Sequence, residues 1–427
     1  MEKLLILGIN TRAIVNSALK LDYITFSGSY FSTLDFKVPH FEKHILKQKQ
    51  ARSCGYFETN YSYEKLLEMS KEMMDEVDHI VLSTGISPID FKGHFKKYKK
   101  KIIGNKKTNN VENKYKFYKK IKSKFLTPKT FKLSYENVSE AIEIAKQHDD
   151  KEFIIKPLQG SGGYGVECLN YYMSNSSKAI DSSSQYFDHK NLTQIFGNQN
   201  SNQKDSYFLV QEFIHGPNIS SSVLGGKNEA KAIINSRMLT EADFNIKNSF
   251  KYCGNIVPLD INTLKQFNNN NNSFNKKMIK TKNINEVSED LITNFKLLGS
   301  NGVDMIINND KIYIIEINPR FQGTYELVEN VLNINLLESH IKACNNESIH
   351  IPNPKGYSIK RIIYSKERVM IGDLAIYNVY DIPYEGVIIE KDQPLATVIT
   401  HENQLSNAMN KLEIANKNIR KRIKHIK

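Results

Sequence analysis

The apolar residues of this chain gather in short runs separated by polar turns, a pattern typical of alternating strands and helices. The run KLLILGIN (Lys3–Asn10) predicts a buried strand, and small or apolar positions then recur at helical spacing from Ala13 to Leu21. ITFSG (Ile24–Gly28) and HIVLSTG (His79–Gly85) predict two further strands. Residues 1–105 are therefore expected to form a small doubly wound α/β domain.

The turn after the first predicted strand carries a single glycine, Gly8. A dinucleotide-binding fingerprint needs the order G-x-G-x-x-G at this place, because its glycines let the backbone approach the pyrophosphate. A nicotinamide-dependent oxidoreductase is therefore not favoured.

A different pattern follows residue 105. NKYKFYKKIKSKF (Asn113–Phe125) predicts an amphipathic helix, and EFIIKPL (Glu152–Leu158) and YFLVQEFI (Tyr207–Ile214) predict strands. GVDMIINNDKIYIIEINPR (Gly302–Arg320) predicts a β-hairpin, with a helix after it.

Two polar tracts, residues 170–206 and 268–277, interrupt this region. They contain too little apolar surface to offset the entropy of ordering, so we expect mobile insertions. The Pro-containing link at 349–356 then separates residues 357–427, where short strands, turns and a basic terminal helix predict a small β-rich domain.

The hairpin carries polar residues where a core strand would be apolar. Counting outward from a turn centred on Asp310 places Asp304 opposite Glu316, and Asn318 lies one step further along the same face. Carboxylate and amide oxygens are the ligands that Mg²⁺ or Mn²⁺ prefers, so these three residues are candidate metal ligands. An alternative is a structural ion pair between Glu316 and Arg320.

The same count fixes the rest of the expected hairpin. The opposite face should be apolar and buried, through Met305, Ile307, Ile315 and Ile317. The expected pairs nearer the turn are Ile306 with Ile314 and Asn308 with Ile312.

The stretch IIKPLQGSGGYG (Ile154–Gly165) places Lys156 on a strand that leads into a glycine-rich loop. Glycines let backbone N–H groups turn toward an anion, and the lysine adds a positive charge, so the stretch is a candidate phosphate site. It is not the G-x-x-x-x-G-K-[ST] loop. A glycine-rich hairpin turn beside a surface lysine is the alternative.

The stretch LVQEFIHGPNIS (Leu209–Ser220) could present backbone groups and Glu212 to an adenine edge, with Phe213 as apolar cover. An ordinary strand end is the alternative interpretation.

The 427-residue chain carries a formal net charge of +13. Its lysines are spread through the sequence and arginines are few, which does not favour RNA or DNA binding. Its four cysteines form no C-x-x-C pair, so we expect a reduced, cytoplasmic environment. No window approaches the roughly 18 apolar residues of a membrane span, so a soluble protein is expected.

Taken in order, Asn113-Lys114 before a helix, IIKP with its glycine loop, QEFIHG, GVDMI and IIEINPR resemble the ATP-grasp superfamily. The resemblance is greatest to archaeal-type carboligase-related members and extends to biotin carboxylase and the purine-biosynthesis carboxylases. It implies a pre-ATP-grasp domain (1–105), a two-lobed ATP-grasp core (106–345, with its lid at about 128–210) and a small β-rich closing domain (357–427).

The resemblance also implies roles for individual residues. Lys114 and Lys156 would hold the nucleotide phosphates, and Asp304, Glu316 and Asn318 would hold two Mg²⁺ (or Mn²⁺) ions. The loop closing over ATP would comprise Gly160, Ser161, Gly162, Gly163, Tyr164 and Gly165. The adenine hinge would comprise Gln211, Glu212, Phe213 and Ile214.

Three further residues have expected roles. Arg320 would act with Lys156 in catalysis by steadying the transferred phosphate. Arg237 either assists it or forms a salt bridge at the edge of the core. Asn218 stands where relatives often have a glutamate that binds the ribose, and an amide can still accept one hydrogen bond.

The function expected from the resemblance is an ATP-dependent ligase that joins a small carboxylate to an amine or another nucleophile through an acyl phosphate, with release of ADP and phosphate. Two alternatives stay open. One is a bicarbonate-using carboxylase, and the other is a catalytically silent nucleotide-sensing or RNA-binding protein. A homo-oligomer is compatible with the sequence, which identifies neither substrate.

Overall fold

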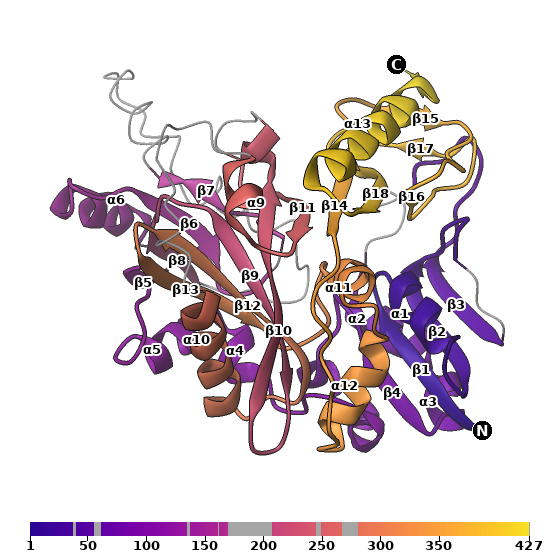
Figure 1. Ribbon diagram of the computed structural model, residues 1–427, viewed down its shortest axis with the longest axis horizontal. Coiled ribbons are helices and arrows are strands. Elements are labelled where there is room, and N and C mark those ends of the chain that lie inside the picture. Colours follow the sequence, from indigo (N-terminus) through magenta and orange to yellow (C-terminus); the bar gives the residue numbers. More distant parts are fainter. Residues whose placement is uncertain are drawn as a thin grey trace.

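The computed structural model describes residues 1–36, 40–54, 61–134, 137–160, 162–169, 207–244, 249–266 and 281–426. The polar tracts at 170–206 and 268–277 and Ser161 of the glycine loop lie outside these residues. Figure 1 shows a parallel sheet at the N-terminal end, antiparallel sheets in the middle of the chain, and the C-terminal helix packed beside the last strands.

The N-terminal sheet is parallel, with the strand order β3-β2-β1-β4. On β1, Leu4 and Ile6 belong to a core cluster with helix α1. Leu5 and Leu7 point to the other face and belong to a cluster with α2 and α3. A strand covered on both faces requires a continuous apolar run, and the predicted α/β unit is confirmed. The bounds are β1 (Glu2–Gly8), α1 (Arg12–Ala18), β2 (Tyr23–Phe31), β3 (Phe41–Leu46), α2 (Tyr63–Met69), α3 (Lys71–Glu76) and β4 (His79–Leu82).

A four-stranded antiparallel sheet, here called the lid sheet, has the order β5-β8-β6-β7. Phe153 and Ile155 of β6 pack against helix α6 on one face. The alternate residues Ile154 and Lys156 therefore face the opposite side, which is open for a site. The bounds are α5 (Lys114–Ile121), β5 (Thr130–Ser134), α6 (Val138–Gln147), β6 (Phe153–Pro157), β7 (Glu167–Cys168) and β8 (Tyr207–Glu212). The linker before them holds η1 (Pro88–Asp90), η2 (Gly93–Lys101) and α4 (Asn109–Glu112).

The largest sheet has eight antiparallel strands in the order β13-β12-β9-β10-β11-β14-β18-β16 and is here called the large sheet. Helix α10 covers one face of β9 with Ile284 and Leu291, which belong to the same core cluster as Ile219 and Val223. The bounds are β9 (Asn218–Gly225), β10 (Ala230–Thr240), η4 (Glu241–Phe244), β11 (Tyr252–Val257), α9 (Ile261–Lys265), α10 (Thr281–Asn294), β12 (Gly299–Asn308), β13 (Lys311–Asn318), α11 (Tyr325–Leu332) and α12 (Leu336–Cys344).

The C-terminal region continues this sheet, because β14 pairs with β11 and is followed by β18 and β16. Helix α13 buries Ala408, Leu412 and Ile419 in one cluster with Ile359 and Val398 of β14 and β18. A small sheet, β17-β15-β19, completes the region. The bounds are β14 (Tyr357–Tyr364), β15 (Val369–Ile371), β16 (Val379–Tyr380), β17 (Ile388–Ile389), β18 (Pro394–Glu402), α13 (Leu405–Lys421) and β19 (Ile423–His425).

The β12-β13 hairpin confirms the most important expected pair, since Asp304 lies opposite Glu316. The pairs expected nearer the turn were wrong by one residue. Asn308 pairs with Lys311 across a two-residue turn, so Ile306 pairs with Tyr313, and Ile307 with Ile312.

A β-bulge compensates for the shorter turn. The register shifts between Asp304 and Met305, where Ile315 is the extra residue on β13. Ile314 and Ile317 therefore enter the core, whereas Ile315 lines the cavity described below. The expectation that Ile315 is a core residue was wrong for this reason.

Arg12 joins the N-terminal domain to the rest of the chain. Its side chain is 2% exposed and lies 3.1 Å from Asp35, 2.8 Å from Glu326 of α11 and 2.8 Å from Asp381 after β16. Burial alone would lower the pKa of Arg12, but these carboxylates outweigh it and raise the pKa. A fully paired buried cation of this kind fixes the three regions relative to one another.

His340 of α12 joins the large sheet to the linker. Its Nδ1 accepts a hydrogen bond from the backbone N–H of Ser300 at 2.8 Å, and Nε2 lies 3.2 Å from the carbonyl oxygen of Ile103. These partners require a neutral ring with its proton on Nε2. Burial lowers the pKa of His340 from the ordinary 6.5 to about 4.

We expect acid to destabilise the protein through His340. The unfolded state takes up the imidazole proton near pH 6.5 and the folded state only near pH 4. The free energy of unfolding should therefore fall by about 3 kcal/mol between these values, at about 1.4 kcal/mol per pKa unit. Denaturant unfolding of the wild type and His340→Gln across this interval measures the difference. Equal slopes for the two proteins would contradict the assignment.

Candidate active site

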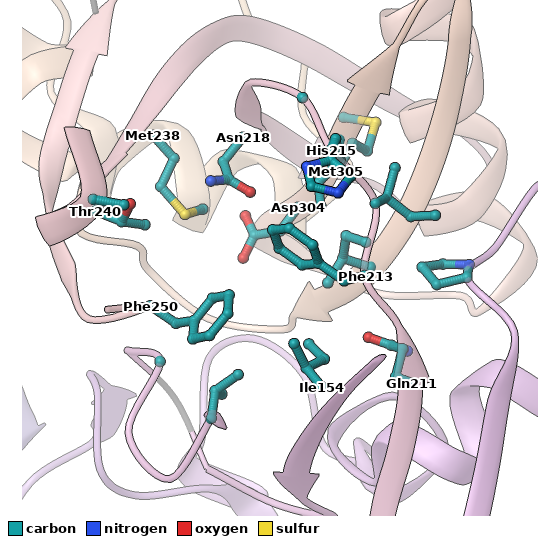
Figure 2. A pocket seen from close by; sticks show the side chains of 18 of the residues that line it. Ile154, Gln211, Phe213, His215, Asn218, Met238, Thr240, Phe250, Asp304 and Met305 are labelled. Carbon is teal, nitrogen blue, oxygen red and sulfur yellow. The ribbon is translucent and has the colours of Figure 1, made fainter. Parts of the chain in front are cut away.

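A cavity of about 970 Å³ lies between the lid sheet and the large sheet, a size that accommodates a nucleotide. Figure 2 shows Ile154 and Gln211 entering it from the lid sheet and Asn218, Met238 and Asp304 from the large sheet. The two lobes thus contribute opposite walls. Phe213, His215, Thr240, Met305 and Phe250 are the other labelled residues of the lining.

The acidic pair lies at one end of this cavity. Asp304 and Glu316 both line it, so they point to the same side of the hairpin. Asp304 accepts hydrogen bonds from Ser220 Oγ at 2.6 Å and from Asn318 Nδ2 at 2.8 Å. Burial, together with the charge of Glu316, raises the pKa of Asp304 to about 7. The two carboxylates therefore repel each other, and a cation between them would favour the charged form of both.

Two lysines approach the carboxylates. Lys156 comes from β6 of the lid sheet, and Lys114 comes from α5, whose Phe117 and Ile121 belong to the core cluster of the large sheet. Lys114 begins helix α5, where Asn113 caps the helix by accepting from the N–H of Lys116. Its Nζ lies 3.4 Å from Oε2 of Glu316 and donates to the carbonyl oxygen of Gly160 at 2.6 Å. Burial alone would raise the pKa of Glu316, but Lys114, Lys156 and Arg320 outweigh it and lower the pKa.

Lys156 is the more deeply buried lysine, with an exposed fraction of 4%. Burial, with the neighbouring charge of Lys114, lowers its pKa to about 7, against the opposing effect of Glu316. A buried amine with a depressed pKa is well placed to gain from a polyanion, because nearby negative charge favours the ammonium form. The site therefore combines two carboxylates, Asp304 and Glu316, whose charged forms a bound cation would stabilise, with an amine, Lys156, whose charged form a bound anion would stabilise.

The glycine loop packs against the segment before β11. Gly160, Gly162, Gly163 and Gly165 all have positive φ, which a side chain disfavours. The carbonyl of Gly162 accepts from the N–H of Tyr252 at 3.0 Å. A Cβ on Gly163 would lie 1.9 Å from the carbonyl oxygen of Phe250. Gly160, Gly162 and Gly163 of this loop line the cavity.

Replacing Gly163 by Ala should weaken nucleotide binding by roughly tenfold or more, because the new Cβ would push the loop away from Phe250. Gly162→Ala is the matched control. It has a similar positive φ, but its Cβ would meet only the Tyr164 ring at 3.4 Å. KM for ATP of the two variants measures the effect. An equal rise in KM for the two variants would contradict the role of the contact with Phe250, because backbone strain alone would then account for the effect.

The hinge joins the two lobes at Gln211, Glu212, Phe213 and Ile214. The carboxylate of Glu212 is already bound, to Lys151 Nζ at 2.7 Å and to the N–H of Lys129 at 3.0 Å. Among the described residues, the N–H of Ile214 has no backbone acceptor. The hinge can therefore present backbone groups to a ligand.

Comparison with known proteins decides the family. The sequence pattern of the ATP-grasp domain matches residues 111–324, which hold both lysines, the glycine loop, the hinge and the acidic hairpin. The chain belongs to the ATP-grasp family.

Two relatives extend this assignment. An uncharacterized protein of Methanocaldococcus jannaschii, MJ0776, is 31% identical over 94% of this chain and 88% of its own length. The tyramine–L-glutamate ligase of the same organism is 36% identical over a shorter stretch, 34% of this chain and 39% of the ligase. The chain thus aligns with well under two thirds of that ligase.

Solved structures show the same ATP-grasp fold. The biotin carboxylase domain of Hydrogenobacter thermophilus 2-oxoglutarate carboxylase matches with a TM-score of 0.66 at 14% identity, over 99% of this chain and 91% of that domain. N5-carboxyaminoimidazole synthetase of Staphylococcus aureus matches with a TM-score of 0.62 at 15% identity, over 97% of both chains. Among the described residues, no helix combines the length and apolar sequence that a membrane span requires.

The acidic end of this cavity offers oxygen ligands for an Mg²⁺ ion that is also coordinated by phosphate oxygens. Asp304 and Glu316 supply carboxylate oxygens, and Asn318, whose nitrogen is used on Asp304, keeps its amide oxygen. The described residues contain no group of three or more His, Cys, Asp or Glu side chains that would enclose a metal alone. Mg²⁺ is commonly held by one or two carboxylates together with substrate phosphates, so the residues present fit.

Of the two candidate arginines, Arg237 lines the cavity and Arg320 does not. Arg237 pairs with Asp243 at 2.7 Å and donates to the carbonyl of Asn218 at 3.3 Å, so the expected salt bridge is present at the cavity edge. Arg320 follows Asn318 after β13, and its charge opposes the rise in the pKa of Asp304 and contributes to the lowered pKa of Glu316. Arg320 is not among the residues that line the cavity.

Sequence reasoning missed two residues of the site. Ser220 holds Asp304 from the neighbouring strand β9, and Thr130 holds Gln211 from β5. Neither has a motif of its own. Their roles depend on the strand pairs Asp304 with Ser220 and Gln211 with Thr130, which a single sequence does not disclose.

Proposed function

We propose that this protein is an ATP-dependent carboxylate–amine ligase that acts through an acyl phosphate. The observation that supports it most directly is that Asp304 and Glu316 on one side of a hairpin meet Lys114 at the start of α5 and Lys156 of the lid sheet within one cavity. Phosphoryl transfer needs alignment and charge neutralisation more than covalent help from the protein, and this arrangement supplies both.

The relatives favour a ligase. The matched ligase of M. jannaschii is named for joining tyramine to L-glutamate, an amine to a carboxylate. The biotin carboxylase domain was solved with MgADP and bicarbonate. Membership of the ATP-grasp family supports ATP and Mg²⁺ as ligands of this chain. Its 14% identity supports the fold alone, so a bicarbonate substrate receives less support than a carboxylate with an amine acceptor.

The proposed mechanism assigns a task to each group. Lys114 and Lys156 hold the phosphates, and the loop from Gly160 to Gly165 covers them. Asp304, Glu316 and Asn318 would hold Mg²⁺, which neutralises the charge of the phosphate chain when bound.

The chemistry then has two steps. A carboxylate oxygen of the first substrate attacks the γ-phosphorus, the bond to the β-phosphate oxygen breaks, and ADP leaves with an acyl phosphate formed. An amine attacks the acyl carbon, loses a proton and expels inorganic phosphate. Arg320 does not line the cavity, but its charge acts on both Asp304 and Glu316, and we assign it the role of steadying the phosphate that is transferred and released.

Phosphate release tests the proposal. Purified full-length protein with Mg²⁺ and ATP should release phosphate when amino acids or other small carboxylates are present together with amines, and little when either pool is omitted. Stimulation by bicarbonate alone would support the carboxylase instead. Nucleotide binding without any turnover, together with salt-dependent RNA binding, would support the silent sensor.

A further inference from the structure

Gln211 lies in the proposed adenine hinge, and the neighbouring strand β5 holds its side-chain amide by a hydrogen bond. It sits on β8 opposite Thr130 of β5, and each residue is 6% exposed. Its Nε2 donates to Thr130 Oγ1 at 2.8 Å, and Thr130 Oγ1 in turn donates to the carbonyl oxygen of Pro128 at 2.9 Å. The three residues form a relay that runs from a backbone carbonyl to the hinge amide.

The relay allows one orientation of the amide. A threonine hydroxyl has a single proton, and here it is used on Pro128, whose carbonyl can only accept. Thr130 can therefore only accept from Gln211, which must turn its NH₂ group toward the hydroxyl. The amide oxygen is left facing the cavity, and Figure 2 shows it on the side toward Ile154 and Phe213.

The result is a fixed pattern of hydrogen-bonding groups. The hinge offers an acceptor, the oxygen of Gln211, and a donor, the N–H of Ile214 that has no backbone partner among the described residues. The edge of adenine offers the matching amino donor and ring-nitrogen acceptor. Guanine offers a carbonyl oxygen and a ring N–H in the same places, so acceptor would meet acceptor and donor would meet donor.

We propose that Thr130 determines the base specificity of this site by locking the amide of Gln211 as an acceptor, so that adenine nucleotides are bound and guanine nucleotides are rejected. The inference rests on the proposed function, since it assumes that the cavity binds a nucleotide. A carboxylate at position 211 would be an acceptor whichever way it turned. A glutamine needs the lock, because a free amide can rotate and present its NH₂ to guanine. Thr130 is thus a positioning residue, which acts on the base only through Gln211.

The test compares equilibrium dissociation constants of Mg-ATP and Mg-GTP on the full-length protein. The wild type should prefer ATP by about 10²-fold or more, since unpaired buried polar groups discriminate strongly. Thr130→Val keeps the shape but removes the acceptor, and the preference should fall to about tenfold or less. Thr130→Ser keeps the hydroxyl and should keep the preference.

A second substitution makes the result specific. Gln211→Glu cannot present a donor at neutral pH, so the double variant Thr130→Val with Gln211→Glu should regain the preference for ATP that Thr130→Val loses. A purely structural effect of Thr130 would not be rescued in this way. Gln211→Met, which has no acceptor, provides an independent variant and should lose the preference whether or not Thr130→Val folds.

The two proposals fail in different ways. A wild-type protein that binds neither nucleotide overturns the proposed function. A wild type that binds ATP, together with a Thr130→Val or Gln211→Met variant that keeps the full preference over GTP, overturns the role of Thr130 and leaves the ligase proposal in place.

Discussion

Replacing Glu316 by Gln should reduce kcat by about 10³-fold while the protein stays folded. The change removes one negative charge from the acidic pair and keeps the size of the side chain. Because Asp304 lies directly opposite, the loss of this charge should also lower the pKa of Asp304 from its present value of about 7. The missing charge should weaken Mg²⁺ binding, so the variant should need more Mg²⁺ for half-maximal rate.

Glu329→Gln is the matched control for this substitution. Glu329 is a partly buried carboxylate that accepts hydrogen bonds from Ser17 Oγ at 2.7 Å and from the N–H of Leu336 at 2.8 Å, outside the cavity. Its replacement should leave kcat within about twofold, since it touches neither phosphate nor metal ligand. Phosphate release and circular dichroism of the two variants at several Mg²⁺ concentrations measure the contrast.

The alternative interpretation of Glu316 predicts a different outcome. If its main role were a structural ion pair, Glu316→Gln would lower the melting temperature, and activity would follow the folded fraction without dependence on Mg²⁺. The observed partner of Glu316 is Lys114 at 3.4 Å, at the start of α5, and no ion pair with Arg320 lies within 4.0 Å among the described residues. This arrangement already disfavours the simple strand-end bridge.

The hairpin shows how far a single sequence can lead. Alternation of polar and apolar residues correctly placed Asp304, Glu316 and Asn318 on one face, because side-chain direction in a strand has a period of two. The exact register near the turn was wrong, since Asn309 adopts a positive φ of 54° and closes a two-residue turn. The bulge at Ile315 then restored the pair by adding one residue.

Contacts between segments that are far apart in the chain could not be predicted from the sequence. Arg12 and Asp381 are 369 residues apart, and nothing in the local pattern around either predicts that they meet. The lock on Gln211 is similar, because it depends on the pairing of β5 with β8 across 81 residues. The family resemblance indicated which residues gather around the nucleotide, but the hydrogen bonds that orient them follow from this chain's own strand register.

The burial of Lys156 was also not evident from its motif. A lysine between Ile155 and Pro157 could lie on an exposed strand edge, where its charge would be free. Its depressed pKa, about 7, arises because burial removes water from the amine and the charge of Lys114 repels the ammonium. That value has consequences for both activity and stability, which can be separated by experiment.

Replacing Lys156 by Met should reduce kcat/KM for ATP by about 10³-fold, because a buried charge aimed at the phosphates is lost. The same change should stabilise the nucleotide-free protein. At pH 7 the unfolded chain carries a full ammonium at position 156, whereas the folded site holds it at a pKa of about 7 instead of 10.5. Removal of the amine should therefore raise the free energy of unfolding by up to about 4 kcal/mol, at about 1.4 kcal/mol per pKa unit.

The size of this stabilisation should depend on pH in a defined way. A depressed lysine pKa means that wild-type stability rises from pH 7 toward pH 10.5, as the unfolded chain loses the proton that the folded site has already lost. The advantage of Lys156→Met should accordingly shrink over this interval. Lys132→Met is the control, since Lys132 and Lys156 both lie opposite Leu209 on β8, but Lys132 does not line the cavity. Denaturant unfolding from pH 7 to 10 and ATP kinetics on both variants measure these effects. A Lys156→Met protein that loses activity and stability together at every pH would contradict the prediction, because it would show that the lysine supports the fold and does not bind phosphate.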